Sequence, residues 1–91
     1  MATAYSAKSG AKTASGRYAI LGHVAVNPTV IPYGTRLYIE NADGNYAYGY
    51  AIAADTGTAL LDGRVDVDLF FESNDDCKRF GKQTVNIYIL P

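Results

Sequence analysis

Apolar residues in this chain recur mainly at every second position, which is the period of a β-strand with one buried face. The segment 46–54 shows the pattern most regularly. Its large side chains share one face and its small ones share the other: Tyr46, Tyr48, Tyr50 and Ile52 against Ala47, Gly49, Ala51 and Ala53. A face made of such small residues predicts that another backbone packs very close to this strand.

Five further segments have strand character and one has helical character. The strands are expected at 3–5, 23–26, 35–40, 65–71 and 84–90, and the Asp-Gly pair within 41–45 indicates a hairpin turn. A helix is expected over 73–81, because Ser73 can cap its first turn and Gly81 can end it. About six strands and one short α-helix predict a mainly β fold in the form of a small closed barrel.

Composition restricts the function further. The 91 residues provide for a single domain, 1–91, and the formal net charge of −1 leaves no basic excess for binding nucleic acid. No apolar run approaches the ~20 residues of a membrane span. Cys77 and His23 are the single residues of their types, so an internal disulfide and a multi-cysteine or His-rich metal centre are excluded, and no cofactor is expected. The start lacks a signal peptide, which fits either a cytoplasmic protein or a domain cut from a longer chain, and the early strand at 3–5 favours the cut domain.

Three aspartates are the candidates for chemistry. Asp55 follows a buried strand and precedes Thr-Gly, so partial desolvation is expected to raise its pKa. Asp66 and Asp68 are two positions apart in a strand, which predicts a shared face and mutual repulsion. Each feature alone also fits an ordinary turn or the solvated side of an edge strand.

The order of the short motifs along the chain is more specific than any one of them. It runs through Thr-Ala-Tyr at 3–5, Thr-Ala-Ser-Gly at 13–16, Val-Ala-Val-Asn-Pro at 24–28, Val-Ile-Pro-Tyr-Gly-Thr at 30–35, Ala-Ala-Asp-Thr-Gly at 53–57, Val-Asp-Leu-Phe-Phe at 67–71 and Val-Asn-Ile-Tyr-Ile-Leu at 85–90. From Thr3 to Leu90 this order resembles the three-aspartate (3D) domain family, which is related to the catalytic barrel of the membrane-bound lytic transglycosylase A type.

The resemblance implies a six-stranded double-psi β-barrel that acts on peptidoglycan. The reaction would cleave the β-1,4 bond between N-acetylmuramic acid and N-acetylglucosamine and form a 1,6-anhydro ring on the muramyl sugar. One carboxyl group would serve as acid and then as base, without the carboxylate pair of ordinary glycosidases. The expected partner is the glycan strand and the expected state is a monomer. The expected place is the cell wall or the outside of the cell, within an exported protein or a phage lysin.

The resemblance also assigns roles by position. Asp68, before Leu-Phe-Phe, would be the general acid/base, and Asp55 would tune it and hold substrate. Asn27 stands where the family has its first aspartate, and Asp66 competes with Asp68 because the chain from Asp55 onward is longer than the commonest spacing. Thr35, Thr56 and Gly57 would line the cleft, with Tyr5 and Lys12 as weaker substrate contacts.

Two other functions fit parts of the sequence. A wall-binding module that kept the barrel without catalysis fits the replacement at Asn27. A dimeric retroviral-type aspartic protease would also use a single Asp-Thr-Gly. That enzyme needs a glycine-rich flap, and 41–50 does not supply one.

Overall fold

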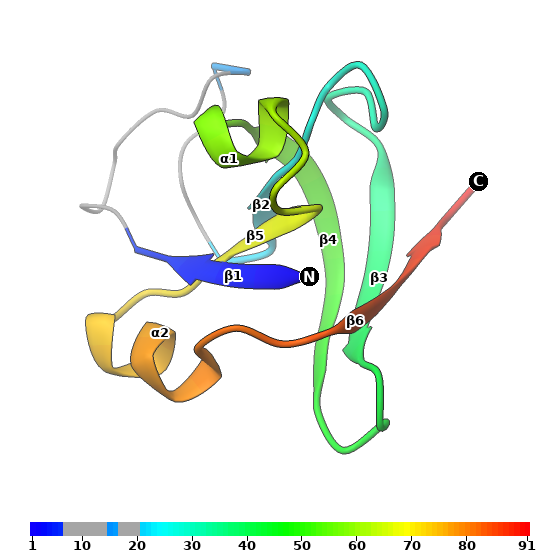
Figure 1. Ribbon diagram of the computed structural model, residues 1–91. Helices are drawn as coiled ribbons and strands as arrows, with labels where there is room; N and C mark the ends of the chain where they lie inside the picture. The colour runs from blue at the N-terminus through cyan, green and yellow to red at the C-terminus, as the bar shows by residue number, and fades with distance from the viewer. Residues whose placement is uncertain (7–14, 17–20) are drawn as a thin grey trace.

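The structure is a computed structural model that describes residues 1–6, 15–16 and 21–91. These residues form six strands and two short helices, whose arrangement can be followed in Figure 1. The strands are β1 (Ala2–Tyr5), β2 (His23–Ala25), β3 (Arg36–Asn41), β4 (Ala47–Asp55), β5 (Val67–Phe70) and β6 (Val85–Ile89), and the helices are α1 (Thr58–Leu61) and α2 (Asn74–Phe80). The mainly β fold and the six strands are confirmed, each within about two residues of its expected bounds.

The helix expected over 73–81 is confirmed as α2. The Ser73 hydroxyl accepts a hydrogen bond from the Asp76 amide, and Gly81 ends the helix with φ 60°. The expectation of a single helix was wrong, because α1 also forms among the described residues. α1 begins after Gly57 with no side-chain cap and no acidic residue in its first turn, so the sequence carries no start signal for it. Burial of Leu60 holds this turn against the protein.

The sheet is mixed, with the strand order β1-β5-β2-β4-β3-β6. The pairs β1–β5 and β2–β4 are parallel, and the other three pairs are antiparallel. The expected closed barrel is not formed by strand pairing, because the ladder stays open between β1 and β6. One antiparallel bridge, Ala2 with Gln83, links the two edges through two backbone hydrogen bonds of 2.7 and 3.0 Å. β1 is short and Gln83 precedes β6, so the contact does not extend into a ladder.

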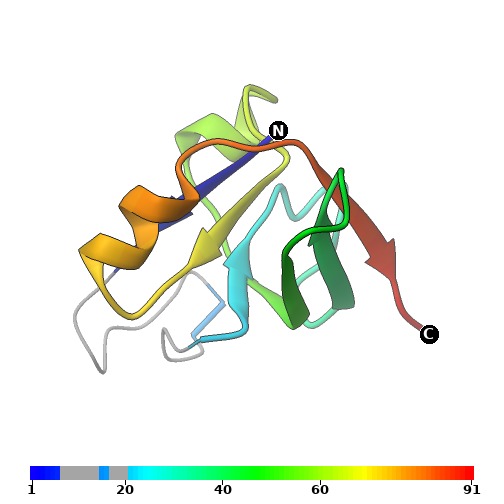
Figure 2. The ribbon, with the colours of Figure 1, turned by 90° about the horizontal axis from the view of Figure 1, so that it is seen from below.

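The core lies on the inner face of this curved sheet. Its fully buried side chains include Leu37, Ile39, Leu69, Val24, Val26 and Val67. The two helices lie on opposite sides of the β1–β5 pair (Figure 1), and α2 packs against β1. Seen from below, α2 and β6 lie on opposite sides of the molecule (Figure 2).

The small residues on one face of β4 lie in two different surroundings. Ala51 and Ala53 are buried in the core, and the backbone of Gly34 and Thr35 bonds directly to Ala53. These bonds continue the β3–β4 pairing in the plane of the sheet, so the close backbone approach over the small face stays a prediction. At Gly49 the prediction was wrong, because a Cβ would meet nothing within 4 Å. Gly49 instead has φ 100° beside a register shift in the β3–β4 ladder, a conformation that favours glycine.

Candidate functional site

Asp55 and Asp68 lie on one row of the sheet, one on each side of Ala25. β2 runs parallel to β4 with Ala25 beside Asp55, and antiparallel to β5 with Ala25 beside Asp68. Directly paired residues point their side chains to the same face. Since neighbouring strands are roughly 5 Å apart, the two aspartate backbones lie about 10 Å apart across the small alanine.

The edge strand β1 extends this row and places a tyrosine beside it. Thr3 pairs with Asp68, and its hydroxyl donates a 2.9 Å hydrogen bond to Asp68 Oδ1. The Tyr5 hydroxyl donates a longer hydrogen bond of 3.5 Å to Asp55 Oδ2, and its ring packs edge-on against Phe70. We call Thr3, Asp68, Ala25 and Asp55 the carboxylate row; Tyr5 covers it from β1.

The surroundings of Asp68 favour its protonated form. Burial raises the pKa of the Asp68 carboxyl above its ordinary value, the Thr3 hydrogen bond opposes this, and the charge of Asp55 adds to it. Burial and the two carboxylates also raise the pKa of Tyr5, so its hydroxyl stays a donor. A carboxyl group that keeps its proton to a higher pH is suited to general acid catalysis.

Asp55 is held by backbone groups at the end of β4. The Thr56 amide donates a 2.9 Å hydrogen bond to Asp55 Oδ1, and the Val26 amide donates one of 2.9 Å to the Asp55 carbonyl. These bonds fix the carboxylate on the side of the strand that carries the row.

Asp66 and Asn27 lie in a different place. Asp66 precedes β5, its side chain is 71% exposed, and it forms a 2.9 Å ion pair with the Met1 ammonium. Asn27 Oδ1 accepts hydrogen bonds from the Thr29 amide and hydroxyl, at 3.0 and 2.7 Å, and so closes a turn. Both residues line a pocket of about 370 Å³ that does not include Asp55 or Asp68. The neighbouring charge that raises the Asp68 pKa is therefore that of Asp55 rather than the expected Asp66.

Of the other residues predicted to line the cleft, some lie beside Asp55 and others do not. Thr56 and Gly57 directly follow Asp55, and the buried Thr56 hydroxyl oxygen has no hydrogen-bond partner among the described residues. The Thr35 hydroxyl donates to the Pro32 carbonyl at 2.6 Å, so it closes a turn. Lys12 lies outside the described residues.

Residues 22–91 match the family model described as "3D domain". The chain belongs to the 3D domain family. The match is narrower than the expected resemblance from Thr3 to Leu90, because it leaves out β1. That strand nevertheless supplies Thr3 to this 3D domain's carboxylate row and the tyrosine, Tyr5, that covers it.

Two proteins of Bacillus subtilis (strain 168) are similar to this 3D domain over 67 residues. YabE, whose provisional name is that of a cell wall shaping protein, is 45% identical, and YocH, named a cell wall-binding protein, is 40% identical. Each alignment covers 74% of this chain, but only 14% of YabE and 21% of YocH. The chain thus spans a small part of the length of these relatives.

Sequence reasoning missed two members of the row, Thr3 and Ala25. Thr3 alternates with Tyr5, so its face could have been inferred from the period of a strand. Its partner could not, because the pairing of β1 with β5 joins residues 65 positions apart. Ala25 carries no chemical group, and its importance appears only when strands from both sides place aspartates next to it.

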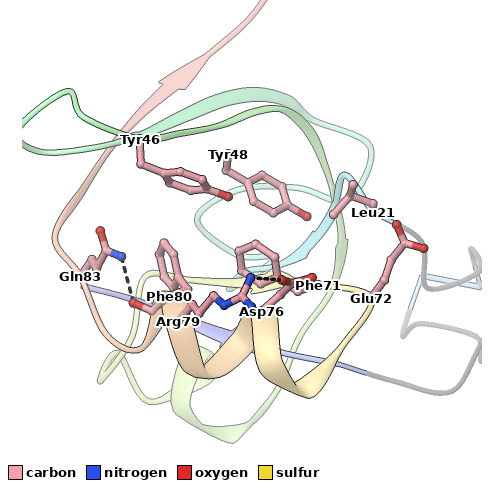
Figure 3. A pocket seen from close by; sticks show the side chains of 9 residues that line it. All are labelled: Leu21, Tyr46, Tyr48, Phe71, Glu72, Asp76, Arg79, Phe80 and Gln83. Carbon is pink, nitrogen blue, oxygen red and sulfur yellow. Dashed lines mark hydrogen bonds and ion pairs between the residues drawn. The ribbon is translucent and has the colours of Figure 1, made fainter.

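A second concave region lies between β4 and α2. Figure 3 shows the rings of Tyr46 and Tyr48 on one side of it and α2 on the other. Its volume is about 560 Å³, and we call it the aromatic pocket; its lining residues are Leu21, Tyr46, Tyr48, Phe71, Glu72, Asp76, Arg79, Phe80 and Gln83. Asp55 and Asp68 are not among them.

Residues 1–6, 15–16 and 21–91 contain no group of three or more His, Cys, Asp or Glu side chains placed to hold a metal ion. Within the same ranges, no helix has the length and apolar character needed to cross a membrane.

Proposed function

We propose that this 3D domain is a peptidoglycan lytic transglycosylase with Asp68 as its general acid/base. The observation that carries the proposal is the carboxylate row, in which a half-buried Asp68 with a raised pKa lies one strand away from Ala25 and two from Asp55. The names of YabE and YocH, which refer to shaping and binding of the cell wall, agree with a cell-wall substrate.

The proposed reaction needs one carboxyl group in two protonation states. The Asp68 proton passes to the glycosidic oxygen while the bond from that oxygen to the muramyl anomeric carbon breaks. The resulting Asp68 carboxylate then accepts the proton of the muramyl 6-hydroxyl, whose oxygen bonds to the same carbon and closes the anhydro ring. Asp68 ends protonated, so no water is consumed and no second catalytic carboxylate is needed.

The neighbours of Asp68 are assigned supporting roles. Asp55 favours the protonated form of Asp68 by its charge, and stabilises positive charge that develops on the sugar. Thr3 holds Oδ1, which leaves Oδ2 to carry the proton. Tyr5, Thr56 and Gly57 are proposed to touch a sugar bound to the two aspartates, because Tyr5 is hydrogen-bonded to Asp55 and the other two directly follow it.

Non-catalytic binding to the wall is the second candidate function. The name of YocH refers to binding, and Asn27 takes the place of a family aspartate. Asn27 already serves in a turn away from the row, so its uncharged amide leaves the proposed acid intact. We leave the aspartic protease aside, because the chain belongs to a different family.

The deciding experiment is turnover of purified peptidoglycan by the domain, with products identified by mass. Lytic cleavage is expected to release anhydro-muropeptides, each lacking one water relative to the hydrolytic product. Release of only reducing-end muropeptides would replace the proposal with a hydrolase. Retention of the domain on the wall with no release would establish the binding module instead.

We propose that the mixed sheet is a double-psi β-barrel whose seam is the Ala2–Gln83 bridge, and that the domain is monomeric and acts in the cell wall without a cofactor. The alternation of parallel and antiparallel pairs around β5 and β2 supports the barrel. Protection of the Ala2 and Gln83 amides from hydrogen exchange would test the seam, since both donate across it.

A further inference from the structure

We propose that the aromatic pocket binds the peptide branch of a peptidoglycan strand, with the side-chain ammonium group of a diamino acid at its rim. This rests on the proposed function, because it assumes that a glycan strand occupies the carboxylate row. It adds a second substrate subsite, which recognises the peptide rather than the sugar.

The walls of the pocket suit an alkyl chain that ends in a cation. Phe71 and Phe80 are buried and lie 5.6 Å apart between ring centroids. Tyr48 packs edge-on against Phe71 at 5.4 Å, and Tyr46 lies 6.2 Å from Phe80. Figure 3 shows these four rings on the two sides of the space. Methylene groups pack against such rings, and an ammonium group near them gains cation–π attraction.

The rim carries both signs of charge, with acid in excess. Glu72 and Asp76 contribute two carboxylates and Arg79 one guanidinium. Burial raises the pKa of Tyr46, and the charge of Asp76 adds to this. Glu72 makes no ion pair with any residue in the described part of the chain. The Arg79–Asp76 ion pair is 3.6 Å long and exposed, so it is weak and easily exchanged for a ligand.

This pattern matches the ionic groups of a wall peptide. A γ-linked glutamate keeps a free α-carboxylate, which can meet Arg79. The diamino acid that follows it carries the ammonium group, which can meet Glu72 and Asp76. A neutral sugar would use neither charge, so the rim favours the peptide over another glycan subsite.

The pocket is connected to the proposed acid through β5. The backbones of Asp68 and Phe71 lie about 10 Å apart, because Phe71, which lines the pocket, is three residues beyond Asp68 in extended chain. Tyr48 connects the two regions: it lines the pocket, donates a 2.6 Å hydrogen bond to the Phe70 carbonyl, and lies close enough to Tyr5 to raise its pKa. Three extended peptide residues reach about 10 Å, so a muramyl sugar at Asp68 could place its third residue in the pocket.

Binding can be measured without any glycan. The isotope-labelled domain is titrated by NMR with the tripeptide L-Ala-γ-D-Glu-L-Lys, and then with the same peptide acetylated on its ε-amino group. Saturable shifts are expected at the amides of Tyr46, Glu72 and Asp76, with affinity falling at least about fivefold on acetylation. Equal affinity for both peptides, or no saturable shift at these residues, would overturn the proposal.

Glu72→Gln is the matching protein variant, and Asp75→Asn is its control. Asp75 is an exposed acid on α2 that does not line the pocket. Removing the Glu72 charge is expected to weaken the tripeptide about three- to tenfold, while Asp75→Asn stays within about twofold. An equal loss of affinity in both variants would mean that only the net charge of the domain matters, and it would contradict a binding site at this rim.

Turnover separates this proposal from the proposed function. Release of anhydro products from glycan strands stripped of peptides tests the Asp68 chemistry alone. The pocket predicts a KM several-fold lower for peptide-bearing strands, and loss of that preference in Glu72→Gln with kcat unchanged. Equal KM for both substrates would overturn the pocket and leave the chemistry standing. Tripeptide binding with no release of anhydro products would support the pocket and overturn the proposed chemistry.

Discussion

The carboxylate row and the turn surface around Asp66 present the same residue type in two contrasting settings. On the row, Asp68 is half-buried, hydrogen-bonded to Thr3 and close enough to Asp55 for their charges to interact. On the turn surface, Asp66 is exposed and paired with the Met1 ammonium, and Asn27 closes a turn with Thr29. Solvent screening weakens an ion pair of the second kind, whereas burial strengthens the interactions of the first.

The contrast shows that sequence spacing alone does not predict which side chains share a face of the sheet. Residues that are two positions apart share a face only when both lie in the paired strand. β5 begins at Val67, so Asp68 is paired on both sides and Asp66 lies outside it. Asp66 and Asp68, the two candidates for the general acid/base, thus differ in their environment, and variants of each can test which one acts.

The largest expected difference is between Asp68→Asn and Asp66→Asn. Loss of a general acid/base is expected to lower the release of anhydro products about 10²- to 10⁴-fold, because Asn carries no transferable proton. Asp66→Asn should keep the rate within about twofold. Both rates come from product mass in parallel digests. Full activity in Asp68→Asn with loss in Asp66→Asn would reverse the assignment.

A smaller effect is expected at the other end of the row, from Asp55→Asn. The rate should fall about tenfold, since the site loses a charge that stabilises the developing cation. Removing that charge also lowers the Asp68 pKa, so the alkaline limb of the pH–rate profile should move to lower pH. A profile that keeps its alkaline limb in place would show that the two aspartates do not interact.

Thr3→Val should shift the same limb in the opposite direction. In the wild type the hydrogen bond from Thr3 favours ionised Asp68. Its loss therefore raises the Asp68 pKa, and the protonated form persists to higher pH. The rate at the optimum should fall about threefold through poorer positioning of the carboxyl, and Thr3→Ser should restore both properties. If Thr3→Ser behaves like Thr3→Val, the hydroxyl is not the group that sets the Asp68 pKa and positions its carboxyl.

The smallest effect is expected from Asn27→Asp, which introduces the aspartate that the family resemblance leads us to expect at this position. An aspartate can accept the same two hydrogen bonds from Thr29, so the turn should form unchanged. The rate is expected to stay within about twofold, because this side chain lies apart from the row. A rise of tenfold or more would mean that the turn surface takes part in catalysis.

The sequence predicted the elements better than their assembly. Alternation and capping were sufficient for the six strands and for α2, because these signals are local. α1 was missed because nothing caps it and only the burial of Leu60 holds it. Gly49 was read as a packing position because alternation gives no sign of the register shift that its positive φ accommodates.

Two residues of the candidate site could be picked out from the sequence, whereas its geometry could not. Asp55 and Asp68 stood out by their motifs, and both lie on the row. Their relation to Ala25 depends on β2 pairing with β4 on one side and β5 on the other, which no local pattern encodes. Thr3 was missed for the same reason, and Asn27 and Thr35 proved to be residues whose side chains close turns.

The central claim is that the row makes Asp68 a carboxylic acid that keeps its proton. NMR titration of the Asp68 side-chain carboxyl carbon tests it most directly, in the wild type and in Asp55→Asn. The row predicts a midpoint above the ordinary aspartate value of about 3.9, and a lower midpoint once Asp55 is uncharged. A wild-type midpoint at or below that value, unchanged by Asp55→Asn, would contradict the claim.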